Sequence, residues 1–197
     1  MKYKHIPVGM FETNCYLVLC GNVLYIIDPG DDAERIKAAA NEFEYDIVRI
    51  LLTHTHIDHI SAIPELMTEM NVESVYMHEN EYIVYSSKEN SIPPWYPAAE
   101  GLPEPVFTPW DDFTVLSTPG HTPGGVCYYF ADNNLIFTGD TLFADSIGRT
   151  DLAGGNHKQL IDSIHNVLMK FDDSVLCLPG HGPATTIGDE RYNNPYL

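Results

Sequence analysis

Residues 47–59 read IVRILLTHTHIDH, an apolar run that leads directly into three histidines and an aspartate. Residues 47–52 are predicted to form a buried strand, after which the chain turns into a helix. A turn at the end of a strand lets neighbouring polar side chains converge instead of facing opposite ways. Imidazole and carboxylate groups suit zinc, iron or manganese. We therefore predict a metal site with these four ligands: His54, His56, Asp58 and His59.

Three more polar residues share one setting, shortly after a predicted strand and directly after a glycine. They are His121, Asp140 and His181. Glycine permits a tight turn, and strand ends on one side of a sheet can meet at one site. Five histidines and two aspartates exceed the needs of one tetrahedral site, whereas a shared carboxylate can hold two cations about 3.5 Å apart. Two divalent metal ions are therefore predicted, with zinc first and iron or manganese as alternatives.

The other four histidines are interpreted as turn or surface residues: His5, His78, His157 and His165. That interpretation does not suit residues 54–59. An accidental gathering of three histidines and an aspartate at one strand end would bury polar groups at a cost in stability. Thr53 and Thr55 are the candidate partners for the second ring nitrogens of these histidines.

Periodicity predicts a mixed α/β protein with one domain over residues 1–197. Strands are predicted at 14–20, 23–28, 47–52, 74–77, 113–117, 125–130, 135–138 and 174–178. Apolar residues spaced three and four apart predict helices over 33–43, 60–70 and 160–171. A Gly/Pro-rich tail is expected after residue 178. Helices before, between and after the strands indicate two sheets, or one large sheet, covered by helices.

Residues 86–112 differ from the rest, with six prolines, two tryptophans and no periodicity. This pattern predicts an irregular surface segment. Two interpretations stay open for it. The segment is a lid that sets specificity, with Trp95 and Tyr96 as apolar walls, or it is a surface loop docked on the core.

Composition narrows the partners. Ten basic and twenty-eight acidic residues give a formal net charge of -18, which repels nucleic acid and anionic membrane surfaces. We therefore expect a small-molecule substrate, with no nucleic acid and no membrane as partner. The N-terminus has no apolar run typical of a signal peptide, and the four cysteines form no CxxC pair, so a cytoplasmic location is expected.

The HxHxDH pattern of residues 54–59, together with the three later positions, resembles the metallo-β-lactamase superfamily. The resemblance runs from about Asn14 to the C-terminus and is strongest to short, bacterial-type members of the glyoxalase II group. It implies a four-layer αββα sandwich with metals at one edge. It also implies that His54, His56 and His121 hold one metal, that Asp58, His59 and His181 hold the other, and that Asp140 bridges them.

The same resemblance implies a hydrolase of small thioesters such as S-lactoylglutathione, through attack by a metal-bridging hydroxide. Asp58 and Asp140 are the implied catalytic residues, and Asp58 would also orient the hydroxide. Arg149 is a candidate substrate contact. Two departures affect the substrate. Residues 146–149 read SIGR where glutathione-specific members have a GCGR-like segment, and only sixteen residues follow His181, so the helical extension that grips glutathione is expected to be absent.

Other functions share this scaffold. The segment GRTD at residues 148–151 resembles that of persulfide dioxygenases, which are mono-iron oxidoreductases. A lactonase or another ester hydrolase is a further alternative. A non-catalytic metal-binding module would require a missing ligand, and all seven candidate positions are present.

Overall fold

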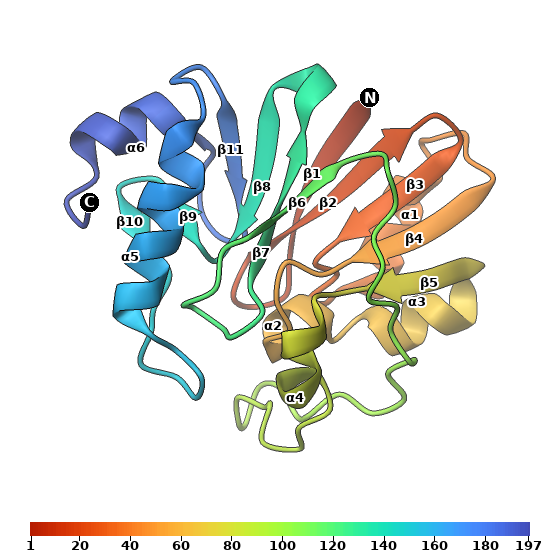
Figure 1. The fold of residues 1–197 in the computed structure, drawn as a ribbon. Helices are drawn as coiled ribbons and strands as arrows, with labels where there is room; N and C mark the ends of the chain where they lie inside the picture. The colour runs from red at the N-terminus through yellow and green to blue at the C-terminus, as the bar shows by residue number, and fades with distance from the viewer. The chain divides into compact units, whose positions relative to one another are not determined.

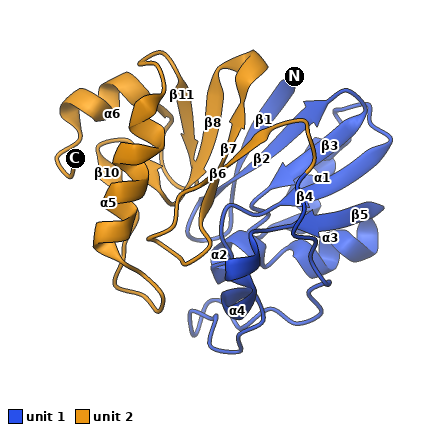
Figure 2. Ribbon diagram, in the orientation of Figure 1, with its two compact units in different colours: residues 1–109 blue, residues 110–197 orange.

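The computed structural model describes residues 1–197 (Figure 1). The chain divides into two compact units, Met1–Pro109 and Trp110–Leu197 (Figure 2). Each unit has its own five-stranded sheet and its own apolar core. The predicted mixture of helices and strands is confirmed, whereas the single domain over residues 1–197 stays a prediction. No helix is both long and apolar enough to cross a bilayer.

The first unit is built on a sheet with strand order β1-β2-β3-β4-β5. Its strands are β1 (Lys2–Val8), β2 (Thr13–Cys20), β3 (Val23–Ile27), β4 (Ile47–Leu51) and β5 (Val72–Tyr76). Its helices are α1 (Ala33–Ala40), α2 (Ile57–Ile60), α3 (Ile63–Glu69), the 3-10 turn η1 (Glu79–Glu81) and α4 (Tyr82–Tyr85). The first three strands are antiparallel, and β3, β4 and β5 are parallel.

Parallel pairing determines where the polar loops of the first unit lie. Every residue of β3 is buried, and α1 connects β3 to β4 and buries one face that includes Ile36. A strand buried on both faces is expected to be apolar throughout. The carboxyl ends of β3, β4 and β5 therefore lie at the same sheet edge, and the loops after residues 27, 51 and 76 all start there.

The second unit is built on a sheet with strand order β12-β11-β8-β7-β6 and a separate β9-β10 hairpin. Its strands are β6 (Thr114–Ser117), β7 (Val126–Phe130), β8 (Leu135–Gly139), β9 (Leu142–Phe143), β10 (Ser146–Ile147), β11 (Leu176–Pro179) and β12 (Thr185–Thr186). Its helices are η2 (Ala131–Asn133), α5 (His157–Asn166), η3 (Leu168–Lys170) and α6 (Ile187–Asn193). Strands β8 and β11 are parallel, and Gly180 N–H donates to the Gly139 carbonyl at 2.8 Å, which brings together the loops that follow both strands.

Three sequence predictions need correction. The helix expected over 60–70 is two helices, because Pro64 lies in the first turn of α3, where proline starts a helix and does not continue one. The tail after residue 178 contains β12 and α6, and the side chain of Thr186 caps α6 by accepting from Asp189 N–H at 3.0 Å. Strand β1 was not predicted, since its sequence KYKHIPV carries the charges and proline typical of an edge strand.

The irregular character of residues 86–112 is confirmed. The segment contains only isolated bridges, from Ile92 to Tyr96 and from Val106 to Tyr76. Three of the four cysteines are buried and Cys20 is half-buried, and all four are free thiols.

Candidate metal centre

Four predicted ligands gather in the first unit, directly after β4. The rings of His54 and His56 are 4.9 Å apart, and those of His54 and His59 are 4.1 Å apart. His54 and His59 are buried, whereas His56 and Asp58 are partly exposed. The start of α2 at Ile57 produces this arrangement, because the chain leaves the strand direction there and turns the side chains together.

Asp28, at the end of β3, orients the buried histidines. Its carboxylate accepts from Thr53 N–H at 2.8 Å and from the Thr53 hydroxyl at 2.6 Å, and it lies 3.2 Å from His59 Nδ1. The Thr53 hydroxyl has one hydrogen, which it donates to Asp28. It therefore accepts from His54 Nδ1–H at 3.1 Å, which makes Nε2 the basic nitrogen of His54.

Thr53 thus has the role expected from the sequence, whereas Asp28 was not identified there. Asp28 ends the predicted strand 23–28 and precedes Pro29-Gly30, so it lacks the preceding glycine that marked the later ligands. Gly30 is required for close packing, because a Cβ at this position would lie 1.7 Å from the carbonyl oxygen of Asp58. The loop after β3 therefore fixes the backbone of one candidate ligand and the rings of two others.

The other three predicted ligands lie in the second unit. Asp140 follows β8, His181 follows β11, and His121 lies between β6 and β7. Asp140 Oδ2 is 3.6 Å from His121 Nε2 and 3.7 Å from His181 Nε2. Two nitrogen or oxygen ligands about 2.1 Å from one tetrahedral metal lie roughly 3.4 Å apart. These separations fit a carboxylate that shares metal coordination with both histidines.

A backbone carbonyl orients His121. Its Nδ1–H donates to the Arg149 carbonyl at 2.7 Å, so that Nε2 is the nitrogen facing Asp140. Gly148, the residue before Arg149, lets this segment pack against the backbone of Asp140, since a Cβ at Gly148 would lie 1.9 Å from the Asp140 carbonyl oxygen. The Arg149 side chain instead forms a bidentate pair with Asp151, at 2.7 and 2.8 Å. This guanidinium lowers the pKa of Asp151 to about 2.

The two aromatic residues proposed as pocket walls have different environments. Trp95 is 57% exposed, whereas Tyr96 is buried. The Tyr96 hydroxyl donates to Asp31 Oδ2 at 2.8 Å, and its ring stacks on Phe11 with centroids 5.5 Å apart. Burial, followed by this hydrogen bond to Asp31, raises the pKa of Tyr96. Tyr96 therefore anchors the 86–112 segment, and Trp95 offers exposed apolar surface.

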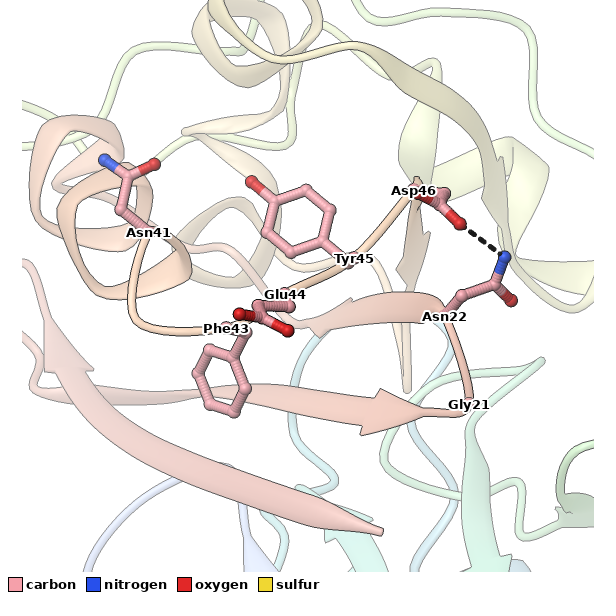
Figure 3. A pocket seen from close by; sticks show the side chains of 7 residues that line it. All are labelled: Gly21, Asn22, Asn41, Phe43, Glu44, Tyr45 and Asp46. Atoms are coloured by element: carbon pink, nitrogen blue, oxygen red, sulfur yellow. Dashed lines mark hydrogen bonds between the residues drawn. The ribbon is translucent and has the colours of Figure 1, made fainter.

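Two cavities of the first unit lie away from the predicted ligands. One, of about 630 Å³, lies between the β2–β3 turn and the connection from α1 to β4, where an Asn22 to Asp46 hydrogen bond crosses its wall (Figure 3). The other, of about 460 Å³, lies between α4 and residues 97–105. No candidate ligand lines either cavity.

Comparison with known proteins gives a consistent result. The model of the metallo-β-lactamase superfamily matches residues 8–181, which include all seven candidate ligands. The chain is 37% identical to "Probable metallo-hydrolase YqgX" of Bacillus subtilis (strain 168), over 100% of this chain and 98% of that protein. It is 35% identical to "Hydroxyacylglutathione hydrolase GloC" of Haemophilus influenzae, again over 100% and 98%.

Solved structures show the same fold. The BLEG-1 B3 metallo-β-lactamase superposes with a TM-score of 0.90 at 36% identity, covering 100% of this chain and 99% of that one. The protein TTHA1623 in a di-iron-bound form superposes with a TM-score of 0.88 at 35% identity, covering 98% and 100%. The predicted metallo-β-lactamase fold is therefore confirmed.

Proposed function

Because the chain belongs to the metallo-β-lactamase superfamily, whose relatives here include metallo-hydrolases, we propose that it hydrolyses a small thioester such as S-lactoylglutathione. The observation that carries the proposal is the geometry of Asp140, whose Oδ2 lies 3.6 and 3.7 Å from two imidazole nitrogens. The similarity to a hydroxyacylglutathione hydrolase over nearly the whole of both chains supports this substrate class.

The proposed ligand assignment follows the family pattern. His54, His56 and His121 belong to one site, Asp58, His59 and His181 to the other, and Asp140 to both. The relative in a di-iron-bound form supports two metals. Zinc is proposed first because neutral imidazoles and carboxylates suit it, and the same donors suit iron and manganese. When bound, two such cations would supply hydroxide near neutral pH and polarise a carbonyl oxygen.

Residues outside the proposed ligand set orient the ligands. Asp28 and Thr53 fix the tautomer of His54, and the Arg149 carbonyl fixes that of His121. Packing of Gly30 against its carbonyl fixes the backbone of Asp58, which we propose as the residue that orients the attacking water.

A thiolate leaving group suits this donor set. A thiol with a pKa near 8.5 leaves without a dedicated general acid, and the ligand set of imidazoles and carboxylates contains none with that role. A small substrate in the cytoplasm is proposed, and the net charge of -18 argues against nucleic acid and anionic membranes. Trp95 is the proposed apolar contact, supported by Tyr96. Arg149 is the proposed cationic contact, which requires that its pair with Asp151 opens.

The first test is the metal content of the purified protein, measured beside hydrolysis of S-lactoylglutathione. About two metals per chain with turnover are expected, and His181→Ala should lose metal and activity together. His165→Ala is the matched control, since this histidine is exposed on α5.

Other results would change the proposal in specific ways. One iron per chain, no hydrolysis, and oxygen uptake with a persulfide would replace it with the oxidoreductase alternative. Two metals with turnover of a lactone or a β-lactam, but not of a thioester, would keep the metal centre and replace the substrate.

A further inference from the structure

Thr55 lies between two proposed ligands, His54 and His56, and three of its polar groups are held by one distant segment. Its N–H donates to Glu81 Oε2 at 2.9 Å, and its hydroxyl donates to the same oxygen at 2.9 Å. Its carbonyl accepts from Asn90 Nδ2 at 2.8 Å. The backbone on either side of Thr55 therefore depends on residues 81–90.

Thr55 lies in a loop that follows β4 and lacks the regular hydrogen bonds of a strand. Strand β4 ends at Leu51, and residues 53–56 belong to no helix or strand. Two carboxylates accept hydrogen bonds from backbone N–H groups of this loop, as the carbonyls of neighbouring strands do within the sheet. Asp28, which follows β3, accepts from Thr53 N–H, and Glu81, which lies in η1 after β5, accepts from Thr55 N–H. Because β4 lies between β3 and β5, the loop is held from both sides.

Burial of the Glu81 carboxylate is energetically unfavourable. The exposed fraction of Glu81 is 0%, as is that of Thr55. Burying a carboxylate is unfavourable unless hydrogen bonds compensate, and an apolar residue of similar volume is often as stable. The η1 turn holds the backbone of Glu81, since Glu81 N–H donates to the His78 carbonyl at 2.9 Å and His78 Nδ1 accepts from Asn80 N–H.

We propose that Glu81 is a positioning residue for metal binding, which holds Thr55 so that the imidazoles of His54 and His56 are directed together. Asn90 holds Thr55 as well, through its hydrogen bond to the Thr55 carbonyl. This inference rests on the proposed metal centre, because Glu81 can act as a positioning residue only if these two histidines are metal ligands. Groups that orient metal ligands from outside typically change metal affinity 10–100-fold when removed.

The test compares zinc dissociation constants, measured by competition with a chelator, for the wild type and four variants. Glu81→Ala should weaken zinc binding by about 10–100-fold. Glu81→Gln should stay within about threefold of wild type, because its amide oxygen can accept from both Thr55 donors. Asn90→Ala, at a partly exposed position, should weaken binding several-fold and serves if Glu81→Ala does not fold. The visible absorption of bound Co²⁺ should change in Glu81→Ala and Asn90→Ala, which reports ligand geometry directly.

Tyr85→Phe is the matched control. It removes a hydrogen bond from the same segment, between the Tyr85 hydroxyl and the Pro103 carbonyl, without touching Thr55. It should lower the unfolding temperature and leave zinc affinity and the Co²⁺ spectrum unchanged. Wild-type zinc affinity and an unchanged spectrum in folded Glu81→Ala, or in Asn90→Ala, would overturn the inference. A wild-type chain that binds no metal would overturn the metal centre itself, a separate and recognisable result.

Discussion

Replacing Asp28 with asparagine should weaken both the metal-free fold and zinc binding. The carboxylate accepts from two donors of Thr53, its N–H and its hydroxyl, through different oxygens. An asparagine has only one acceptor oxygen, so its NH₂ group must face one of these donors or His59 Nδ1. Since Asp28 and Thr53 are almost fully buried, water does not replace the lost hydrogen bond.

The size of the effect follows from these contacts. Leaving one buried donor unsatisfied costs about 1–3 kcal/mol, and hydrogen bonds to a charged acceptor fall in the upper part of that range. A loss of about 2 kcal/mol corresponds to a fall of roughly 4–8 °C in the unfolding temperature of a chain this long. Zinc binding should weaken by about 10–100-fold, because the tautomer of His54 is no longer fixed through Thr53.

Calorimetry of the metal-free proteins and chelator competition measure the two effects separately. Asp46→Asn is the matched control, since Asp46 is exposed and accepts one surface hydrogen bond from Asn22. Its unfolding free energy should stay within about 0.5 kcal/mol of wild type. If Asp28→Asn unfolds at the same temperature as Asp46→Asn and binds zinc equally well, the assignment of Asp28 as the group that orients these histidines is refuted.

Three further outcomes are expected. Gly148→Ala places a methyl group 1.9 Å from a backbone carbonyl, so zinc affinity should fall at least about tenfold, measured by chelator competition with circular dichroism to verify folding. Trp95→Ala should raise KM for the thioester several-fold with kcat retained, whereas Ile83→Ala, at an even more exposed apolar residue, should change neither; equal kinetics in both would remove Trp95 from the substrate site. By NMR, Asp151 should titrate with a pKa of about 2, rising toward its ordinary value in Arg149→Gln. Because its folded pKa is depressed, the stabilisation is complete above the unfolded pKa and is lost as pH falls toward 2.

Local sequence marks the candidate ligands, because each follows an apolar strand and lies at a predicted turn, and their role as ligands stays a prediction. The glycines before His121, Asp140 and His181 are visible without any structure. The limits of β2, β4 and β7 were likewise predicted closely, since apolar runs mark buried strands.

The groups that orient the ligands could not be found in the same way. Asp28 and Glu81 act on residues 53–55 only because β3, β4 and β5 are neighbours in the sheet, and strand order is a property of pairing over long distances. The sequence indicates the side chain of Arg149 as a substrate contact, whereas in the structure it is the Arg149 carbonyl that orients His121. Helix α6 was not predicted because the glycine and proline before it are typical of a loop, although Thr186 is a favourable capping residue.

The distribution of the candidate ligands along the chain has a consequence for biosynthesis. The first unit contributes residues 54–59, and the second contributes residues 121, 140 and 181. A ribosome that has completed the first unit has made the orienting carboxylates Asp28 and Glu81, but fewer than all the proposed ligands. On this assignment the full donor set exists only after His181 has been synthesised, so both proposed metal sites can be completed only at the end of synthesis. Cells short of the proposed metal should then accumulate complete, metal-free chains, whose lifetime depends on how stable the two units are without their ions.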